Sequence, residues 1–224
     1  MGIKTKNFFI MERVNKPFSD RVEAGRRLGE ELKKTYGNEA VVLGIPRGGV
    51  VVAESLAQVL GATLDIVLSR KIGAPGNPEF AIGAISEDGE FFLNKDFVHQ
   101  TGAGHEYVEQ ERARQTAEIK RRRILFRNAH PKVPLKNRTV IITDDGIATG
   151  ATFQAAMWAV RQECPIRLIA AIPVGPEDSL CKVAEDADEL LCARVPDFFY
   201  ALSQFYAQFD QIEDKQVLEI LTRN

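Results

Sequence analysis

Residues that build disulfide frameworks and metal centres are scarce in this sequence. Its 224 residues include three cysteines (Cys164, Cys181 and Cys192) and three histidines. The cysteines are odd in number and none belongs to a CxxC pair, so we expect reduced thiols in a cytoplasmic protein. With so few nitrogen and sulfur ligands, we do not expect a transition-metal site built from side chains alone.

Long hydrophobic runs are also missing. No apolar stretch approaches the roughly 20 residues of a bilayer-spanning helix. The N-terminal MGIKTKNFF lacks the hydrophobic stretch of a signal peptide. We therefore predict a cytoplasmic protein with no membrane partner.

Neither sign of charge is in excess, because 29 Lys and Arg face 31 Asp and Glu for a net charge of −2. Nucleic-acid surfaces depend on excess positive charge, so nucleic acid is not an expected partner. The sequence also lacks a GxxxxGK[ST] or GxGxxG loop after any expected strand. This argues against a nucleotide-dependent kinase or dehydrogenase.

What the sequence does contain is an alternation of apolar runs and helical patterns, which is typical of a parallel α/β sheet. Several runs are continuous, as in strands covered on both faces. The length is within the range of one domain. Strands are expected at residues 40–44, 64–69, 81–86, 140–143, 168–173 and 190–193, and helices at 20–36, 104–127 and 215–221, with others beginning near Val50 and Phe153.

Residues 140–152, VIITDDGIATGAT, form the most specific pattern in the chain. Apolar and β-branched residues lead into Asp144 and Asp145, and a loop of small and hydroxyl residues then opens a helix. The unpaired N–H groups and partial positive charge of a helix N-terminus suit a phosphate. Two carboxylates, which only accept hydrogen bonds, suit the paired hydroxyls of a sugar. The segment therefore predicts a site for a ribose 5-phosphate.

This segment resembles the signature of the type I phosphoribosyltransferases, in which it binds the ribose 5-phosphate of phosphoribosyl pyrophosphate (PRPP). The chain is most similar to bacterial members whose acceptor is undefined. By this resemblance Asp144 and Asp145 would contact ribose hydroxyls. Gly146 stands where the family usually has an apolar residue, and we expect it to loosen the turn. The 5-phosphate loop would consist of Gly146, Ile147, Ala148, Thr149, Gly150, Ala151 and Thr152.

The resemblance also implies the architecture: one α/β domain with a central parallel sheet flanked by helices, a flexible lid and a small hood. The core would cover about residues 40–194, and the hood would form from residues 1–18 and 195–224. The heavily charged helix at 104–127 would be an insertion that packs on the sheet or against a second subunit. A homodimer is expected from the same resemblance.

A second loop, GIPRGG at residues 44–49, follows the first expected strand. Gly48 and Gly49 let the backbone approach a ligand closely, and Arg47 adds a planar donor fork that suits pyrophosphate oxygens. Alone, this segment could be an ordinary turn. Beside the acidic motif, we interpret it as the pyrophosphate loop of the resembling family.

The segment after residue 69 predicts a lid. Arg70 and Lys71 precede a stretch with two glycines and two prolines, which predicts a hinged, exposed excursion. Its start is similar to the mobile loop of adenine phosphoribosyltransferases. Such a lid would exclude water, while the two cations stabilise charge on the departing pyrophosphate. The resemblance implies Mg²⁺ as the cofactor, bound with PRPP and contacted at most by Asp144 and Asp145.

The acceptor is less well defined. Ala148 stands where hypoxanthine-guanine enzymes have an acidic residue, so 6-oxopurine salvage by that route is not expected. Glu79 on the lid is a candidate for acceptor activation, the alternative being an exposed solubilising residue. Phe198 or Phe199, in a stretch similar to the hood of that family, would stack on a base or else pack the C-terminal segment onto the sheet. We predict transfer to a nitrogen acceptor, expected to be a nucleobase.

A different class of function stays open. The same fold could serve a non-catalytic PRPP or nucleotide sensor, or an RNA-binding regulator. The run Arg121, Arg122 and Arg123 would suit a phosphate or RNA. Charge runs on helices are more often solvated faces. The cations expected on the lid favour an enzyme, because a sensor has no need to exclude solvent.

Overall fold

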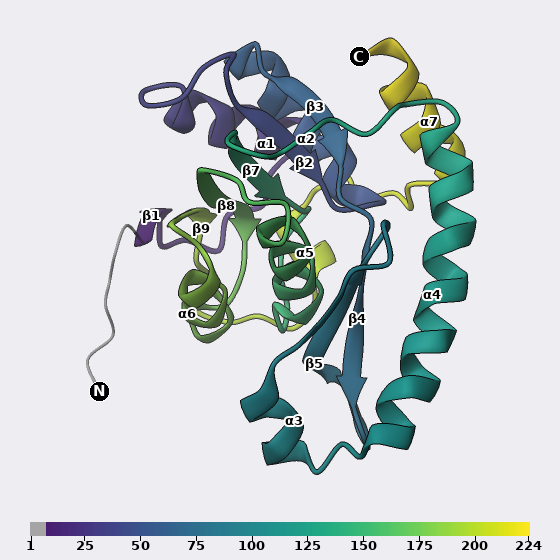
Figure 1. The fold of residues 1–224 in the computed structure, drawn as a ribbon. Helices are drawn as coiled ribbons and strands as arrows, with labels where there is room; N and C mark the ends of the chain where they lie inside the picture. Colours follow the sequence, from purple (N-terminus) through teal and green to yellow (C-terminus); the bar gives the residue numbers. More distant parts are fainter. Residues whose placement is uncertain (1–7) are drawn as a thin grey trace.

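The computed structural model describes residues 8–224, in which a six-stranded sheet forms the centre of the molecule (Figure 1). The strand order is β1-β9-β8-β7-β2-β3, and all neighbouring pairs are parallel. The expected α/β fold is therefore confirmed. The strands are β1 (Phe8–Glu12), β2 (Val41–Gly44), β3 (Thr63–Ile66), β7 (Thr139–Thr143), β8 (Arg167–Val174) and β9 (Glu189–Arg194).

The apolar strands supply a core on each face of this sheet. Successive side chains point to opposite faces, so Val42 and Ile141 join one cluster and Val41 and Ile142 join the other. Each fully buried aliphatic side chain contributes about 1.5–3 kcal/mol. The first cluster lies under α1 (Arg21–Leu32), α2 (Gly48–Leu60) and α7 (Asp214–Arg223), and the second under α5 (Ala151–Arg161) and α6 (Glu177–Asp186).

The expected loop is a hairpin of a second, antiparallel sheet, and its tip at residues 75–79 is exposed as predicted. The sheet consists of β4 (Ser69–Ala74), β5 (Asn77–Ser86) and β6 (Phe91–Leu93). Residues 81–86 are a strand as expected, but of this sheet and not of the parallel one. Two glycines explain the hairpin: Gly76 turns the chain with φ +71°, and a Cβ on Gly73 would lie 2.8 Å from the Cα of Pro78.

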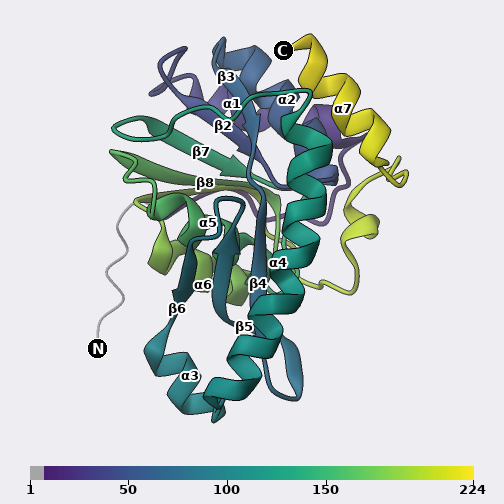
Figure 2. The same ribbon diagram turned by 45° about the vertical axis from the view of Figure 1, so that its right-hand side comes forward.

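The β4–β5 hairpin lies between two helices. On one side Ile72, Ile82 and Ile85 pack with residues of α4 (His105–Arg127), and Figure 2 shows this long helix running beside the hairpin. On the other side Ala81 and Ala84 pack against the first turns of α5. The short helix α3 (Lys95–Thr101) connects β6 to α4. The inserted helix thus has a partner in the fold, the hairpin.

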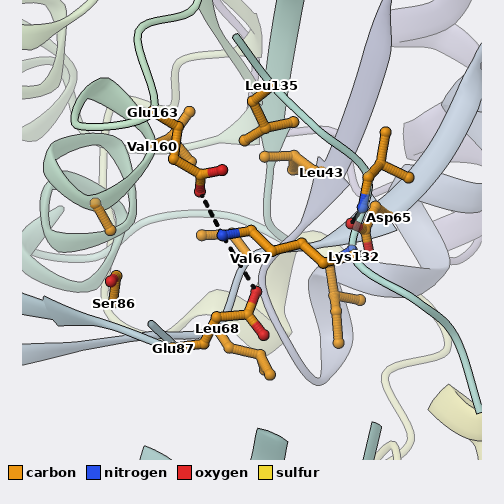
Figure 3. Close-up of a pocket in the computed structure, with 13 residues that line it drawn as sticks. Leu43, Asp65, Val67, Leu68, Ser86, Glu87, Lys132, Leu135, Val160 and Glu163 are labelled. Carbon is orange, nitrogen blue, oxygen red and sulfur yellow. Dashed lines mark hydrogen bonds and ion pairs between the residues drawn. The ribbon is translucent and has the colours of Figure 1, made fainter. Parts of the chain in front are cut away.

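Buried ion pairs join the hairpin and α4 to the main sheet. Arg127 at the end of α4 donates from Nη1 to Asp65 of β3 over 2.6 Å and from Nε to Glu87, just after β5, over 2.7 Å. Nearby, Lys132 pairs with Glu163 over 3.0 Å beside a cavity of about 10 Å³ (Figure 3). Asp65 and Glu87 are almost inaccessible, so these cations balance charges that burial would otherwise destabilise.

A segment near Phe18 contacts the C-terminal segment beside the sheet. The amide of Phe18 donates to the Phe205 carbonyl over 2.8 Å, next to the 3₁₀ turn η1 (Leu202–Phe205). Residues 8–12, expected in the hood, instead form the edge strand β1 beside β9. Residues 1–7 of the expected hood lie outside the described part of the chain, and the division into core and hood stays a prediction.

Within residues 8–224, no helix combines the length and apolarity needed to cross a bilayer.

Candidate active site

The two loops singled out in the sequence meet at one edge of the sheet. Strands β2 and β7 are neighbours, with Gly44 opposite Thr143, and the amide of Ile45 donates to the Thr143 carbonyl over 3.0 Å. The carboxyl ends of both strands therefore deliver their loops to the same place. Crevices at this end of parallel strands are the usual ligand sites of α/β sheets.

The glycine pair packs directly on the acidic pair. A Cβ on Gly48 would lie 1.9 Å from Oδ2 of Asp145, and one on Gly49 would lie 2.8 Å from Oδ1 of Asp144. Arg47 precedes the first residue of α2 and follows a cis peptide bond from Pro46. Any side chain at residues 48 or 49 would displace the carboxylates, so both glycines are required for this contact.

Burial sets the electrostatics of the acidic pair. It raises the pKa of Asp144 well above its usual range, and the neighbouring charge of Asp145 raises it further. The pKa of Asp145 is also raised by burial, although the guanidinium of Arg21 opposes that shift. The backbone amide of Asp145 donates to Oδ1 of Asp144 over 2.8 Å, which fixes the Asp144 side chain against the backbone of the next residue. A cation or a hydroxyl donor at this point would relieve the cost of the buried charges.

Arg21, on the N-terminal helix, is the main site residue that sequence reasoning missed. Its Nε donates to Oδ2 of Asp145 over 2.9 Å, and its Nη1 donates to the Asp210 carbonyl over 2.9 Å. Its guanidinium carbon lies 3.9 Å from the centre of the Phe209 ring. Tyr206 also donates its hydroxyl to the Asp145 carbonyl. Arg21 and the C-terminal segment thus both contact Asp145.

The expected 5-phosphate loop leads into α5 as predicted. Gly150 is the residue before the helix and has φ +81°, which suits glycine. The loop is anchored at two points: Ile147 donates its amide to the Val174 carbonyl over 2.9 Å, and Ser179 donates its hydroxyl to the Ala148 carbonyl over 2.6 Å. Ala148 and Thr149 between these anchors are exposed. The amide of Ala151 donates to Oγ1 of Thr149 over 3.4 Å, and Thr152 in the first turn of α5 is exposed.

Gly146 does not act as the sequence suggested. Its φ is +150°, and a Cβ there would lie 2.3 Å from Cδ1 of Leu202 and 2.9 Å from the Val174 carbonyl oxygen. The glycine lets the C-terminal segment close tightly on the loop. The turn after the acidic pair is consequently packed, not loosened.

An open pocket of about 470 Å³ lies in front of these loops. Its walls come from α1, the two loops, α4 and the C-terminal segment, so residues far apart in sequence converge here. The lining residues include Arg21, Arg47, Gly48, Arg122, Asp145 and Phe209.

The lid residues border a second pocket of about 210 Å³ between β4 and α4, with Thr152 of the 5-phosphate loop among its lining residues. Arg70 is half-buried there and donates from Nε to Gln115 over 2.8 Å. Lys71 pairs with the exposed Glu79 over 2.9 Å. The two cations therefore lie on an ordered strand that faces the 5-phosphate loop.

The aromatic residues expected to stack on a base lie elsewhere. Phe198 is 68% exposed, and Phe199 packs on Phe205 with their ring centres 5.2 Å apart. The aromatic ring that lines the 470 Å³ pocket is Phe209. The only sequence signal for Phe209 was its place in a C-terminal extension rich in aromatics. The sequence alone could not show which of these aromatic residues lines the pocket.

Comparison with known proteins agrees with this geometry. The family model described as “Phosphoribosyl transferase domain” matches residues 19–210. “Putative phosphoribosyl transferase Rv0571c” of Mycobacterium tuberculosis is 42% identical over 208 residues, which are 93% of this chain and 47% of that protein. Its counterpart MT0597 from another strain matches equally well. The chain therefore spans about half the length of these curated relatives.

A solved structure matches over nearly its whole length. The crystal structure of TT1426 from Thermus thermophilus is 42% identical, with a TM-score of 0.87. The match covers 92% of this chain and 98% of that one. From the family match, these relatives and the converging loops, the chain belongs to the phosphoribosyl transferase family.

Proposed function

We propose that the protein transfers the 5-phosphoribosyl group of PRPP to a nitrogen acceptor, expected to be a nucleobase, and releases pyrophosphate. The observation that carries the proposal is the meeting of three anion- and ribose-binding features at one sheet edge. These are the acidic pair, the 5-phosphate loop before α5 and the Arg47 loop before α2. Each suits one part of PRPP.

The reaction breaks the bond between the anomeric carbon and a pyrophosphate oxygen and forms one from that carbon to nitrogen. The pyrophosphate leaves with the bonding electrons, and the nitrogen gives up a proton. Preorganised cations stabilise the charge that develops on the leaving group, which supports this assignment for Arg47, Arg70 and Lys71. Acceptor activation by Glu79 would require its pair with Lys71 to separate.

Mg²⁺ fits the donors of this site. Asp144 and Asp145 offer the oxygen ligands that the ion prefers, and the raised pKa values of both carboxyls reflect buried charge that a cation would offset. In our proposal Mg²⁺ arrives with PRPP, and these two residues contact it directly or through its waters. When bound, it would neutralise part of the pyrophosphate charge.

Pyrophosphate release from PRPP with Mg²⁺ tests the proposal. The assay would include adenine, hypoxanthine, guanine, xanthine, uracil, orotate or no acceptor. Release that depends on one acceptor would establish the transferase and identify its substrate. PRPP binding without release for any acceptor would instead favour a sensor. Absence of PRPP binding in calorimetry would overturn the assignment of the site.

A substitution in the acidic pair tests the proposed PRPP site most directly. Asp145→Asn should weaken PRPP binding about ten- to a hundred-fold, because a charge-assisted hydrogen bond contributes roughly 1.5–3 kcal/mol. Calorimetry with PRPP and Mg²⁺ measures this directly. Asp96→Asn, on the exposed surface of α3, makes the same chemical change away from the loops and should bind like the wild type. Equal affinities for both variants would contradict the assignment of Asp145.

A further inference from the structure

One face of the inserted helix α4 turns toward the lid strand. Glu111, Gln115, Glu118 and Arg122 recur every three or four residues and so share a face. Gln115 receives the hydrogen bond from Arg70. Glu111 and Gln115 also line the 210 Å³ pocket beside the lid, and Arg122 lines the 470 Å³ pocket beside the acidic pair. This face therefore borders both pockets.

The arginine run splits between two environments. The Arg122 side chain is 27% exposed and lines the same pocket as Arg47, Gly48 and Asp145. The Arg121 side chain is 57% exposed and does not line that pocket, and Arg123 is exposed as well. The expectation of a solvated face thus fits two of the three arginines.

A single carboxylate holds Arg122 in place. Glu118 accepts a bond from Nε of Arg122 over 2.9 Å and two bonds from Arg121 over 3.1 and 3.0 Å. Within residues 8–224, the Arg122 side chain donates a hydrogen bond from Nε only. Both terminal nitrogens therefore stay available to a ligand. Glu118 orients the guanidinium while sharing its charge with a second arginine.

Three arginines, Arg21, Arg47 and Arg122, line this pocket together with two acidic residues, Asp145 and Asp210. Arg47 and Arg122 line one pocket, and Arg70 lies close enough that burial and then the charge of Arg122 lower its pKa. Asp145, the acidic motif residue on this wall, already pairs with Arg21. Arg47 and Arg122 line the same pocket and offer planar guanidinium groups, which suit the oxygens of a multiply charged phosphate anion.

We propose that Arg122, contributed by the inserted helix, binds the pyrophosphate group of PRPP together with Arg47. The inference rests on the proposed function, since it assigns a further residue to the same substrate. It gives α4 a place in the active site in addition to its packing against the hairpin.

Calorimetry of two neighbouring variants tests this residue. Arg122→Gln should weaken binding of both PRPP and inorganic pyrophosphate, each with Mg²⁺, by about tenfold or more, which is about 1.4 kcal/mol. Arg121→Gln is the matched control: it removes the same charge and one partner of the same Glu118, but outside the pocket. It should bind both ligands within about twofold of the wild type. Arg122→Lys, which keeps the charge and loses the planar fork, should fall between.

The outcomes separate the two proposals. If the wild type binds both ligands and the two glutamine variants behave alike, Arg122 does not bind pyrophosphate, while the proposed function stands. Loss of PRPP binding with unchanged pyrophosphate binding also overturns the inference. If the wild type binds neither ligand, the proposed function fails first. Matching thermal midpoints for the two variants would show that a selective loss of affinity in Arg122→Gln arises in the pocket.

Discussion

At the scale of single residues, the buried carboxyl of Asp144 lowers the stability of the fold at neutral pH. Burial, then Asp145, raises the pKa of Asp144 above its unfolded value. Below the unfolded pKa both states hold the proton, and no stability is lost. As the pH rises past that value, the unfolded chain releases its proton first, so the folded state loses relative stability. Binding of a cation or a hydroxyl donor at Asp144 would offset this loss of stability.

Asp144→Asn should therefore raise the thermal midpoint at pH 7, and the gain should shrink toward pH 3–4. The amide keeps the oxygen that accepts from the Asp145 amide. Each kcal/mol gained would appear as about 2–4 °C in a domain of this size. Melting curves between pH 3 and 7 measure the difference, with Asp96→Asn as the control. A variant less stable than the wild type at pH 7 would contradict the explanation.

Arg21 should contribute to stability through Asp145. The pair is almost buried, with 9% and 14% of the two side chains exposed. Removing one partner of a buried pair costs about 3–5 kcal/mol, because the other charge stays behind. We expect Arg21→Gln to approach this loss in urea unfolding. The double variant Arg21→Gln with Asp145→Asn should recover part of it. Strictly additive losses would show that the two side chains do not interact.

Local sequence could predict Asp144 and Asp145 but not Arg21. The acidic residues stand next to a strand and a small-residue loop, a pattern contained within residues 140–152. Arg21 reaches the site from a helix more than a hundred residues away, and nothing around it differs from an ordinary charged helix. Arg122 is ambiguous for the same reason, because a solvated arginine and a pocket arginine share one local pattern.

At the scale of elements, the ion pairs at the end of α4 should decide whether the hairpin stays docked. Arg127 contacts both Asp65 and Glu87, which are buried. Arg127→Met should cost about 3–5 kcal/mol, because it leaves two buried carboxylates without this partner. Urea unfolding measures the loss, and hydrogen exchange should show it first in β4 and β5. Arg123→Met, on the exposed face, should change the free energy of unfolding by less than about 0.5 kcal/mol.

Elements with a strong apolar period were predictable, and those whose formation depends on packing were not. Strands β2, β7, β8 and β9 lie within one or two residues of their expected ranges. Strand β4 was missed because its glycine and the following proline-glycine turn are typical of a loop until β5 pairs with it. Helix α6 is short, and its apolar face is formed mainly by Leu180 and Val183. Its signals, Pro176 before the first turn and two acidic residues within it, were present in the sequence.

At the scale of the whole molecule, the two sheets should unfold together. The hairpin lies between α4 and α5, and α5 also covers the main sheet, so neither sheet can lose its partner alone. We predict one cooperative transition by calorimetry, with the same midpoint by far-UV circular dichroism and by fluorescence of Trp158. Two separated transitions would show that the hairpin and α4 form an independent unit. The homodimer expected from family resemblance stays a prediction that sedimentation would check.

The contact between the hairpin and α5 sets the distance between the lid and the 5-phosphate loop, and this distance could be changed in steps. Ala81 and Ala84 of β5 meet Ala151 and Ala155 of α5, in a cluster that also contains Trp158. Alanine is the smallest residue with a side chain, and each position can be enlarged one methyl at a time. Because α5 begins at the 5-phosphate loop, each enlargement would act as a spacer between that loop and the lid. In a graded series of such variants, the affinity for the ligand should change stepwise with the size of the side chain at this contact.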